Sequence, residues 1–121
     1  MIRGIRGATT VEANDAKIIH SQTEALVKTM IEKNKIEPED VAHVIVSVTD
    51  DIDQAFPARP IRELPGWQFV PVMCTKEMSV PGGLPYCIRV MMTVNTSKEQ
   101  QAIKHIYQHD ARQLRPDLLD E

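Results

Sequence analysis

The segment "CIRVMMTV" (residues 87–94) decides the fold, because it has the two-residue period of a β-strand and is apolar on both faces. One face, which predicts an ordinary core face beneath helices, is formed by Ile88, Val90, Met92 and Val94. The opposite face is formed by Cys87, Arg89, Met91 and Thr93. Since this second face is too apolar for a solvated sheet surface, we expect another copy of the chain to cover it.

Arg89 is the charged residue in this otherwise apolar strand. A guanidinium that is removed from water needs a partner, because an unpaired buried charge is strongly destabilising. Glu77 is a candidate for a structural ion pair with it. The alternative partner is a ligand that arrives from solution, and the sequence leaves these two possibilities open.

Three further strands are predicted before residue 87. β-Branched residues and glycines predict a strand at residues 2–12, with close backbone approach at its glycines. Alternating valines predict a second strand at residues 43–49. Residues 67–74 predict a third strand, in which Pro71 indicates a sheet edge or a bulge.

The helical segments predicted between and after these strands differ in length. Apolar residues on one helical face predict a helix from residue 15 to residue 34, with Asn14 as its N-cap. Pro38 opens a short helical turn, and Pro60 begins a short helix. Residues 97–110 predict a second helix of modest length. This order of elements indicates an α+β fold, a mixed sheet with helices on one face.

Length and composition indicate one domain with its own core. The chain has 121 residues, of which 42% are hydrophobic and only 4% aromatic. We therefore expect a single domain over residues 1–121, with about 115–121 as a flexible C-terminal tail, and a core built from aliphatic side chains and methionine.

The overall charge and the hydropathy pattern exclude several classes of partner. The formal net charge of -3 predicts no nucleic-acid partner. No segment has the length and apolarity of a membrane span, and residues 1–10 do not resemble a signal peptide. Cys74 and Cys87 are accordingly expected to be reduced thiols in a cytoplasmic protein.

The sequence contains no common motif for phosphate, dinucleotide, metal or nucleophilic chemistry. His105 and His109 are four residues apart on the predicted second helix. Such a pair is much more often solvated than metal-bound. We therefore expect neither a metal nor a cofactor.

Arginines are the candidate functional residues. Arg6 lies in the first predicted strand, Arg89 lies in an apolar strand, and Arg62 and Arg115 stand near prolines. Arginine binds carboxylates through a planar, bidentate fork. For any one arginine a structural ion pair is an ordinary alternative, but the surroundings of Arg89 favour a ligand.

Four blocks of the sequence also resemble a known family. They are "MIRGIRGATTVE" (1–12), "FPARPIRELPGWQFVPVMCTKEM" (56–78), "GGLPYCIRVMMTV" (82–94) and "LRPDL" (114–118). These blocks are similar to the small, monofunctional, trimeric class of chorismate mutase, and the similarity runs through nearly the entire chain. The resemblance implies a ferredoxin-like α+β subunit, with three subunits forming a pseudo α/β-barrel and active sites at their interfaces.

The reaction that the resemblance implies is the Claisen rearrangement of chorismate to prephenate in aromatic amino-acid biosynthesis, without a cofactor. By the same resemblance, Arg89 contacts the ether oxygen and a carboxylate, Arg6 binds the side-chain carboxylate, and Tyr107 hydrogen-bonds to it. Glu77 and Cys74 meet the ring hydroxyl. The complete implied site assigns catalysis to Arg6, Glu77 and Arg89, and substrate binding to these three with Phe56, Ala58, Arg59, Arg62, Met73, Cys74, Thr75, Lys76, Tyr107, Leu114 and Arg115.

Two positions depart from the pattern of this family. Members often have threonine where Met73 stands and lysine where Arg59 stands. Arg59 keeps the charge, whereas Met73 is expected to contribute through its backbone or as an apolar wall. The alternative function is that of a trimeric, carboxylate-binding protein similar to the small enamine/imine deaminases.

Overall fold

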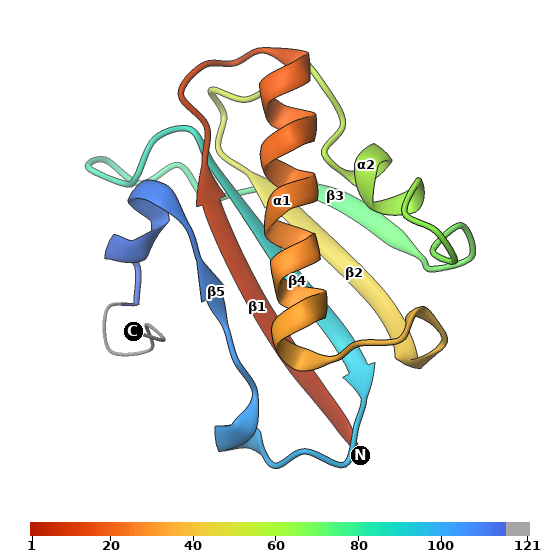
Figure 1. Cartoon of the computed structure of the whole chain (residues 1–121). Coiled ribbons are helices and arrows are strands. Elements are labelled where there is room, and N and C mark those ends of the chain that lie inside the picture. Colours follow the sequence, from red (N-terminus) through yellow and green to blue (C-terminus); the bar gives the residue numbers. More distant parts are fainter. Residues whose placement is uncertain (116–121) are drawn as a thin grey trace.

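The structure is a computed structural model that describes residues 1–115. Most of the predicted C-terminal tail, residues 116–121, lies outside the described residues. In chain order the elements are β1 (Ile2–Thr10), α1 (Ala16–Asn34), η1 (Pro38–Asp40), β2 (Val41–Val48), α2 (Ala58–Arg62), β3 (Val72–Lys76), β4 (Cys87–Asn95), η2 (Gln100–Ala102), β5 (Ile106–Tyr107) and η3 (His109–Gln113), where η marks a 3-10 helix (Figure 1).

The strands form one mixed sheet in the order β3-β2-β4-β1-β5. The central strand β4 is antiparallel to both of its neighbours, β1 and β2, whereas β3 and β5 are added in parallel at the two edges. β3 is an edge strand, as Pro71 indicated. The predicted start at residue 67 was wrong, because the strand begins only at Val72, directly after the proline. The predicted α+β class is therefore confirmed.

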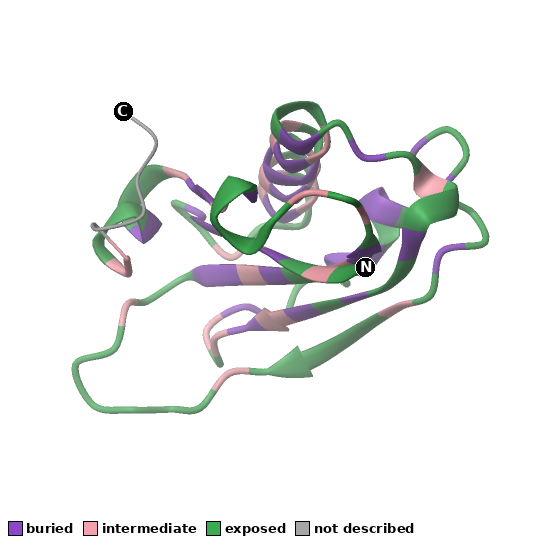
Figure 2. Cartoon of the chain, turned by 90° about the horizontal axis from the view of Figure 1, so that it is seen from below, coloured by how far each residue is buried: buried purple, intermediate pink, exposed green. Residues whose placement is uncertain are grey.

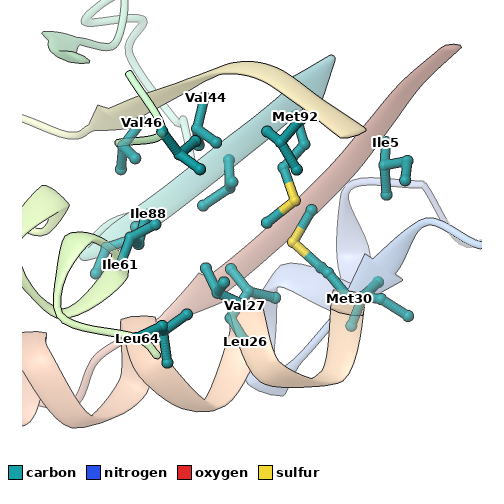
Figure 3. Packing of buried hydrophobic residues seen from close by; sticks show 14 of the residues in the cluster. Ile5, Leu26, Val27, Met30, Val44, Val46, Ile61, Leu64, Ile88 and Met92 are labelled. Carbon is teal, nitrogen blue, oxygen red and sulfur yellow. The ribbon is translucent and has the colours of Figure 1, made fainter. Parts of the chain in front are cut away.

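The core lies between the sheet and the helices. Figure 2 shows α1 over the sheet with its buried side towards the strands. Side chains from β2, β4, α1 and the α2 region meet in one cluster, which includes Val44, Val46, Ile88, Met92, Leu26, Val27, Ile61 and Leu64 (Figure 3). All four residues of the predicted core face of β4 are buried. The two-residue period of residues 87–94 thus assigned its inner face correctly.

α1 packs closely against β1 because β1 has a glycine beneath it. A Cβ atom on Gly7 would lie 2.4 Å from the sulfur of Met30. The sheet and the helix can therefore come this close only because residue 7 has no side chain. The N-cap of α1 is Asp15, whose Oδ2 accepts from the backbone N–H groups of Lys17 and Ile18. The prediction of Asn14 as the cap was wrong by one residue, because the Asn14 side chain bonds to the loop at Asp53 instead.

The predicted helix at residues 97–110 was wrong. This segment contains the short η2 turn, the two-residue strand β5 and the start of η3. β5 pairs with Gly7 and Ala8 of β1, and the side chain of Asn34 bonds to both backbone polar groups of Lys104. These contacts with distant residues satisfy the backbone in place of a helix, so tertiary packing overrides local helix propensity.

Candidate active site

Arg89 and Glu77 lie next to one another at the end of the sheet. Arg89 is on β4, and Glu77 follows the last residue of β3. The Nε atom of Arg89 is 3.2 Å from Oε2 of Glu77. This Nε is buried yet has no aligned hydrogen bond, so the contact is an ion pair whose N–H is not directed at the carboxylate. Of the two partners for Arg89 that the sequence left open, the structural one, Glu77, is therefore present.

The Glu77 carboxylate is oriented by groups that sequence analysis did not single out as functional. The hydroxyl of Ser47 donates to Oε2 at 3.2 Å, and the backbone N–H of Met78 donates to Oε1 at 3.2 Å. The backbone N–H of Glu77 itself donates to Val48 at 2.9 Å. Ser47 lies on the same face of β2 as Ile45. A serine among the apolar residues of this strand was the sequence feature that could have identified it as a site residue.

Arg6, Arg89 and Tyr107 share the face of the sheet opposite α1. Ala8 of β1 pairs with Arg89 on one side and with Tyr107 on the other. Paired residues point to the same face, and Arg6 lies two positions before Ala8, so its side chain points there as well. Gly7 faces Met30 of α1 on the other side. The register thus gathers two cations and a phenol in one region.

Three buried side-chain polar atoms in the described part of the chain have no hydrogen-bond partner. They are Nε of Arg6, Nε of Arg89 and the hydroxyl of Tyr107. Buried polar atoms are usually satisfied, and exceptions call for an explanation. All three belong to residues that the family resemblance assigns to substrate binding, and the three residues share the face of the sheet opposite α1.

His105 extends the pairing between β1 and β5 beside Arg6. Its Nδ1 accepts a 3.0 Å hydrogen bond from the backbone N–H of Arg6, so the neutral ring carries its proton on Nε2. Burial, and then the charges of Arg6 and Arg115, lower the pKa of His105 from its ordinary value. His109 lies 3.0 Å from the Gln22 side chain instead, so the two histidines contact different parts of the chain.

The remaining predicted residues form a second group around β3 and α2. Phe56, Cys74, Thr75 and Lys76 line a hollow of about 360 Å³. Arg59 and Arg62 are exposed on α2, Met73 is exposed on β3, and Ala58 is buried. Glu77 and Arg89 instead line a separate hollow of about 420 Å³. One chain therefore does not gather all the predicted residues in one pocket.

The end of the described chain lies beside the first group. Leu114 packs against the small cluster of Ala8, Tyr107 and Ala111. Arg115 is half-buried, and its charge acts on His105. Leu114 therefore lies beside Tyr107, and Arg115 lies within electrostatic reach of His105.

Both cysteines are free thiols, as expected from the sequence. Cys74 is exposed and Cys87 is buried. Burial raises the pKa of the Cys87 thiol, although the charge of Arg89 opposes this effect. Within residues 1–115, no cluster of three or more histidine, cysteine or carboxylate side chains has the arrangement of a metal site. In the same range, no helix has the length and apolarity needed to cross a membrane.

Comparisons with known proteins give one consistent result. The sequence profile of the family "Chorismate mutase type I" matches residues 2–118. The chain is 52% identical over 118 residues to the chorismate mutase AroH of Bacillus subtilis, covering 98% of this chain and 93% of that protein. It is 44% identical over 119 residues to the chorismate mutase AroH of Thermus thermophilus, covering 98% and 97%.

A solved structure extends the likeness to three dimensions. The chorismate mutase from Clostridium thermocellum superposes with a TM-score of 0.88 at 48% identity, over 91% of this chain and 97% of that one. The chain belongs to the chorismate mutase type I family, and it is an isomerase.

Proposed function

We propose that the chain performs the chorismate mutase reaction at Arg6, Glu77, Arg89 and Tyr107, in a pocket that a second subunit of a homotrimer completes. The observation that carries this proposal is the set of three buried polar atoms without a hydrogen bond, on residues that share one face of the sheet. Chorismate is a dianion with an ether oxygen, so it offers acceptors to two guanidinium groups and to a phenol at once.

Arg89 acts on the bond that breaks. In the rearrangement of chorismate to prephenate, the C–O bond breaks ahead of C–C bond formation, and negative charge grows on the ether oxygen. A guanidinium that is already held in place, and that the bound substrate and the second subunit shield from water, stabilises this charge more in the transition state than in the ground state. Glu77 holds Arg89 from one side and orients the ring hydroxyl together with Cys74.

Arg6 and Tyr107 act on the conformation of the substrate. The enolpyruvyl arm has to fold over the ring before the new C–C bond forms. Binding of its carboxylate by Arg6 and Tyr107, while Arg89 holds the ether oxygen, selects the folded conformer and removes much of the entropic cost of reaching it. No proton is transferred, so we expect kcat to be nearly flat from about pH 6 to pH 9.

The open face of the sheet supports the assembly. Ile45 is 44% exposed, Met91 is 41% exposed and Met73 is 72% exposed, and the pairing register puts these three side by side across β3, β2 and β4. A contiguous apolar stripe of this kind is typical of a protein interface. A homotrimer in which the sheets meet would cover it, as the sequence predicted.

The assembly also accounts for the two separate groups of site residues. Phe56, which is 75% exposed, belongs with Cys74 and Thr75 to one hollow, whereas Arg89 belongs to another. If the hollow beside Phe56 in one subunit meets the hollow beside Arg89 in its neighbour, the two together form both walls of the pocket. Arg59, Arg62, Met73 and the residues at 114 and 115 would then lie at or near its rim.

Two measurements on the purified chain test this proposal. Chorismate absorbance should fall while prephenate forms, and light scattering should give the mass of three chains at micromolar concentration. A well-folded protein that leaves chorismate unchanged would contradict the site, and a stable monomer would contradict the assembly. The relatives described above give the deaminase-like alternative no support.

A further inference from the structure

The loop from Glu77 to Tyr86 joins β3 to β4. Both of its ends are attached to residues 48–51, which are the last residue of β2 and the turn that follows it. At its start, the N–H of Glu77 donates to the carbonyl of Val48 at 2.9 Å. After its end, the N–H of Cys87 donates to Oγ1 of Thr49 at 3.0 Å, and the N–H of Thr49 donates to the carbonyl of Cys87 at 3.1 Å. Residues 48–51 therefore hold both ends of a long loop.

Asp51 completes this attachment through both of its carboxylate oxygens. Oδ2 accepts the backbone N–H of Tyr86 at 2.9 Å. Oδ1 accepts the hydroxyl proton of Thr49, the same hydroxyl whose oxygen accepts from Cys87. The carboxylate is thus occupied by protein groups on both sides, and it orients the Thr49 hydroxyl towards β4.

Tyr86 needs this support because of its backbone conformation. Its φ of 52° lies in the left-handed region, which residues other than glycine rarely adopt. Its N–H is held by Asp51, and its carbonyl accepts from Val11 at 2.9 Å. Loss of the Asp51 carboxylate leaves this conformation with one backbone contact fewer at the point where the chain turns into β4.

The two residues that lie next to these attachments are the members of the candidate ion pair. Glu77 is at the first end of the loop, and Arg89 follows Cys87 by two positions on β4. We infer that Asp51 is a positioning residue, which sets where Arg89 stands relative to Glu77 and to the bound substrate. This inference rests on the proposed function, because it assigns Asp51 a role through those two side chains.

Substitutions at Asp51 and at its neighbour Asp50 test the role of the carboxylate. Asp50 has the same charge but is exposed, and its contact is a 3.6 Å ion pair with the exposed Lys76. We expect Asp51→Ala to lower kcat by about tenfold to a hundredfold with little change in KM, since small displacements of a catalytic group act mainly on the transition state. Asp50→Ala should lower kcat clearly less than Asp51→Ala does, because its exposed ion pair with Lys76 is weak and does not hold the loop.

Asp51→Asn separates anchoring from charge. The amide oxygen can still accept the Tyr86 N–H, and the amide nitrogen can donate to Thr49, so we expect kcat to recover to within about threefold of the wild type. If Asp51→Asn and Asp50→Ala were both as impaired as Asp51→Ala, local charge would be the cause and the inference would be wrong. Wild-type kcat in Asp51→Ala would also overturn it.

Amide hydrogen exchange of the substrate-free protein gives a readout that does not need activity. In Asp51→Ala the amides of Tyr86, Cys87 and Glu77 should exchange at least about tenfold faster, while the amides of the β1–β4 pairing keep their rates. Unchanged exchange at Tyr86 would contradict the anchoring role even if the chain proved inactive towards chorismate. An inactive wild type with the expected exchange pattern would instead contradict only the proposed function.

A double-mutant cycle tests the route through Arg89. If Asp51 acts by placing this guanidinium, then Asp51→Ala should lower the residual kcat of the Arg89→Ala enzyme by less than about twofold. The full tenfold to hundredfold loss in that background would mean that Asp51 acts independently of Arg89, and the inference would be withdrawn.

Discussion

Arg89 and Glu77 form an ion pair across the end of the sheet, with Nε 3.2 Å from Oε2. The side chains are 42% and 28% exposed, respectively, and a pair with this much access to water contributes about 0–1 kcal/mol to stability. The pair is therefore too weak to be the reason for an arginine in this strand. It orients the guanidinium, and the region around it remains open to a ligand.

Removal of the Arg89 guanidinium should affect catalysis far more than folding. We expect Arg89→Ala to lower kcat by about 10²- to 10³-fold, the usual scale for loss of one oriented electrostatic group. Arg89→Lys should recover only part of this loss, because lysine keeps the charge but not the planar fork. The assay is the loss of chorismate absorbance, with thermal unfolding and light scattering on the same samples.

Arg3→Ala is the matched control for these variants. Arg3 lies near the start of β1, and its Nε donates to the carbonyl of Lys98 at 3.2 Å, away from the ion pair. We expect its kcat to stay close to that of the wild type. An Arg89→Ala enzyme that fails to fold would show a structural role instead, and one with normal turnover would remove Arg89 from the mechanism.

The free energy of unfolding should decrease as the pH falls below about 6.5, and His105 should contribute to that decrease. Its pKa in the folded chain is lowered from the ordinary value of 6.5 by burial first and then by Arg6 and Arg115; Lys33 and Arg112 line the same hollow. Below pH 6.5 the unfolded chain binds a proton at this residue more readily than the folded chain does. Protonation therefore favours unfolding, and stability is lost as the pH falls through this window.

Urea unfolding at several pH values between 5 and 8 measures this effect. The difference between the wild type and His105→Asn isolates His105 from the other histidines, because the asparagine does not titrate. We expect the variant to lose less stability than the wild type between pH 6.5 and pH 5. Parallel pH dependences in the two proteins would contradict a lowered pKa of His105 in the folded chain.

The two cysteines should differ in their reaction with a small alkylating reagent. Cys74 is exposed in the hollow beside Phe56, whereas Cys87 is buried and its pKa is raised by that burial. We expect mass spectrometry to find one adduct on Cys74 and the chorismate assay to show impaired binding. Cys74→Ala should keep much of the activity and resist the reagent. A Cys74→Ala enzyme as inactive as Arg89→Ala would point to covalent catalysis instead.

The close approach of β1 and α1 predicts a large difference between two similar substitutions. A Cβ atom at position 7 would lie 2.4 Å from the buried sulfur of Met30, so we expect Gly7→Ala to destabilise the protein by about 1–3 kcal/mol. A Cβ atom at position 4 would lie 3.3 Å from the sulfur of Met91, a much smaller overlap that a small shift of this flexible side chain relieves. Gly4→Ala should therefore cost less, and equal losses in urea unfolding would contradict the packing argument.

Local pattern was sufficient for the elements whose side chains repeat with a clear period. The alternation in residues 87–94 assigned the core face of β4, and the apolar face of residues 15–34 predicted α1 and its end near Asn34. Burial of a periodic face is the largest favourable term in these elements, so the period alone identifies them. The arginine in the apolar strand likewise pointed to the candidate active site, and its catalytic role stays a prediction that Arg89→Ala tests.

Tertiary structure decided what depends on residues distant in sequence. The segment at 97–110 has helical propensity, but its pairing with β1 and its contacts with Asn34 make it an edge strand and two short turns. The contacts of Ser47 with Glu77, and of Asp51 with Tyr86, likewise join segments that no periodicity relates. Such contacts depend on strand order and register. No local sequence pattern specifies strand order or register, because both are fixed only when the whole sheet has formed.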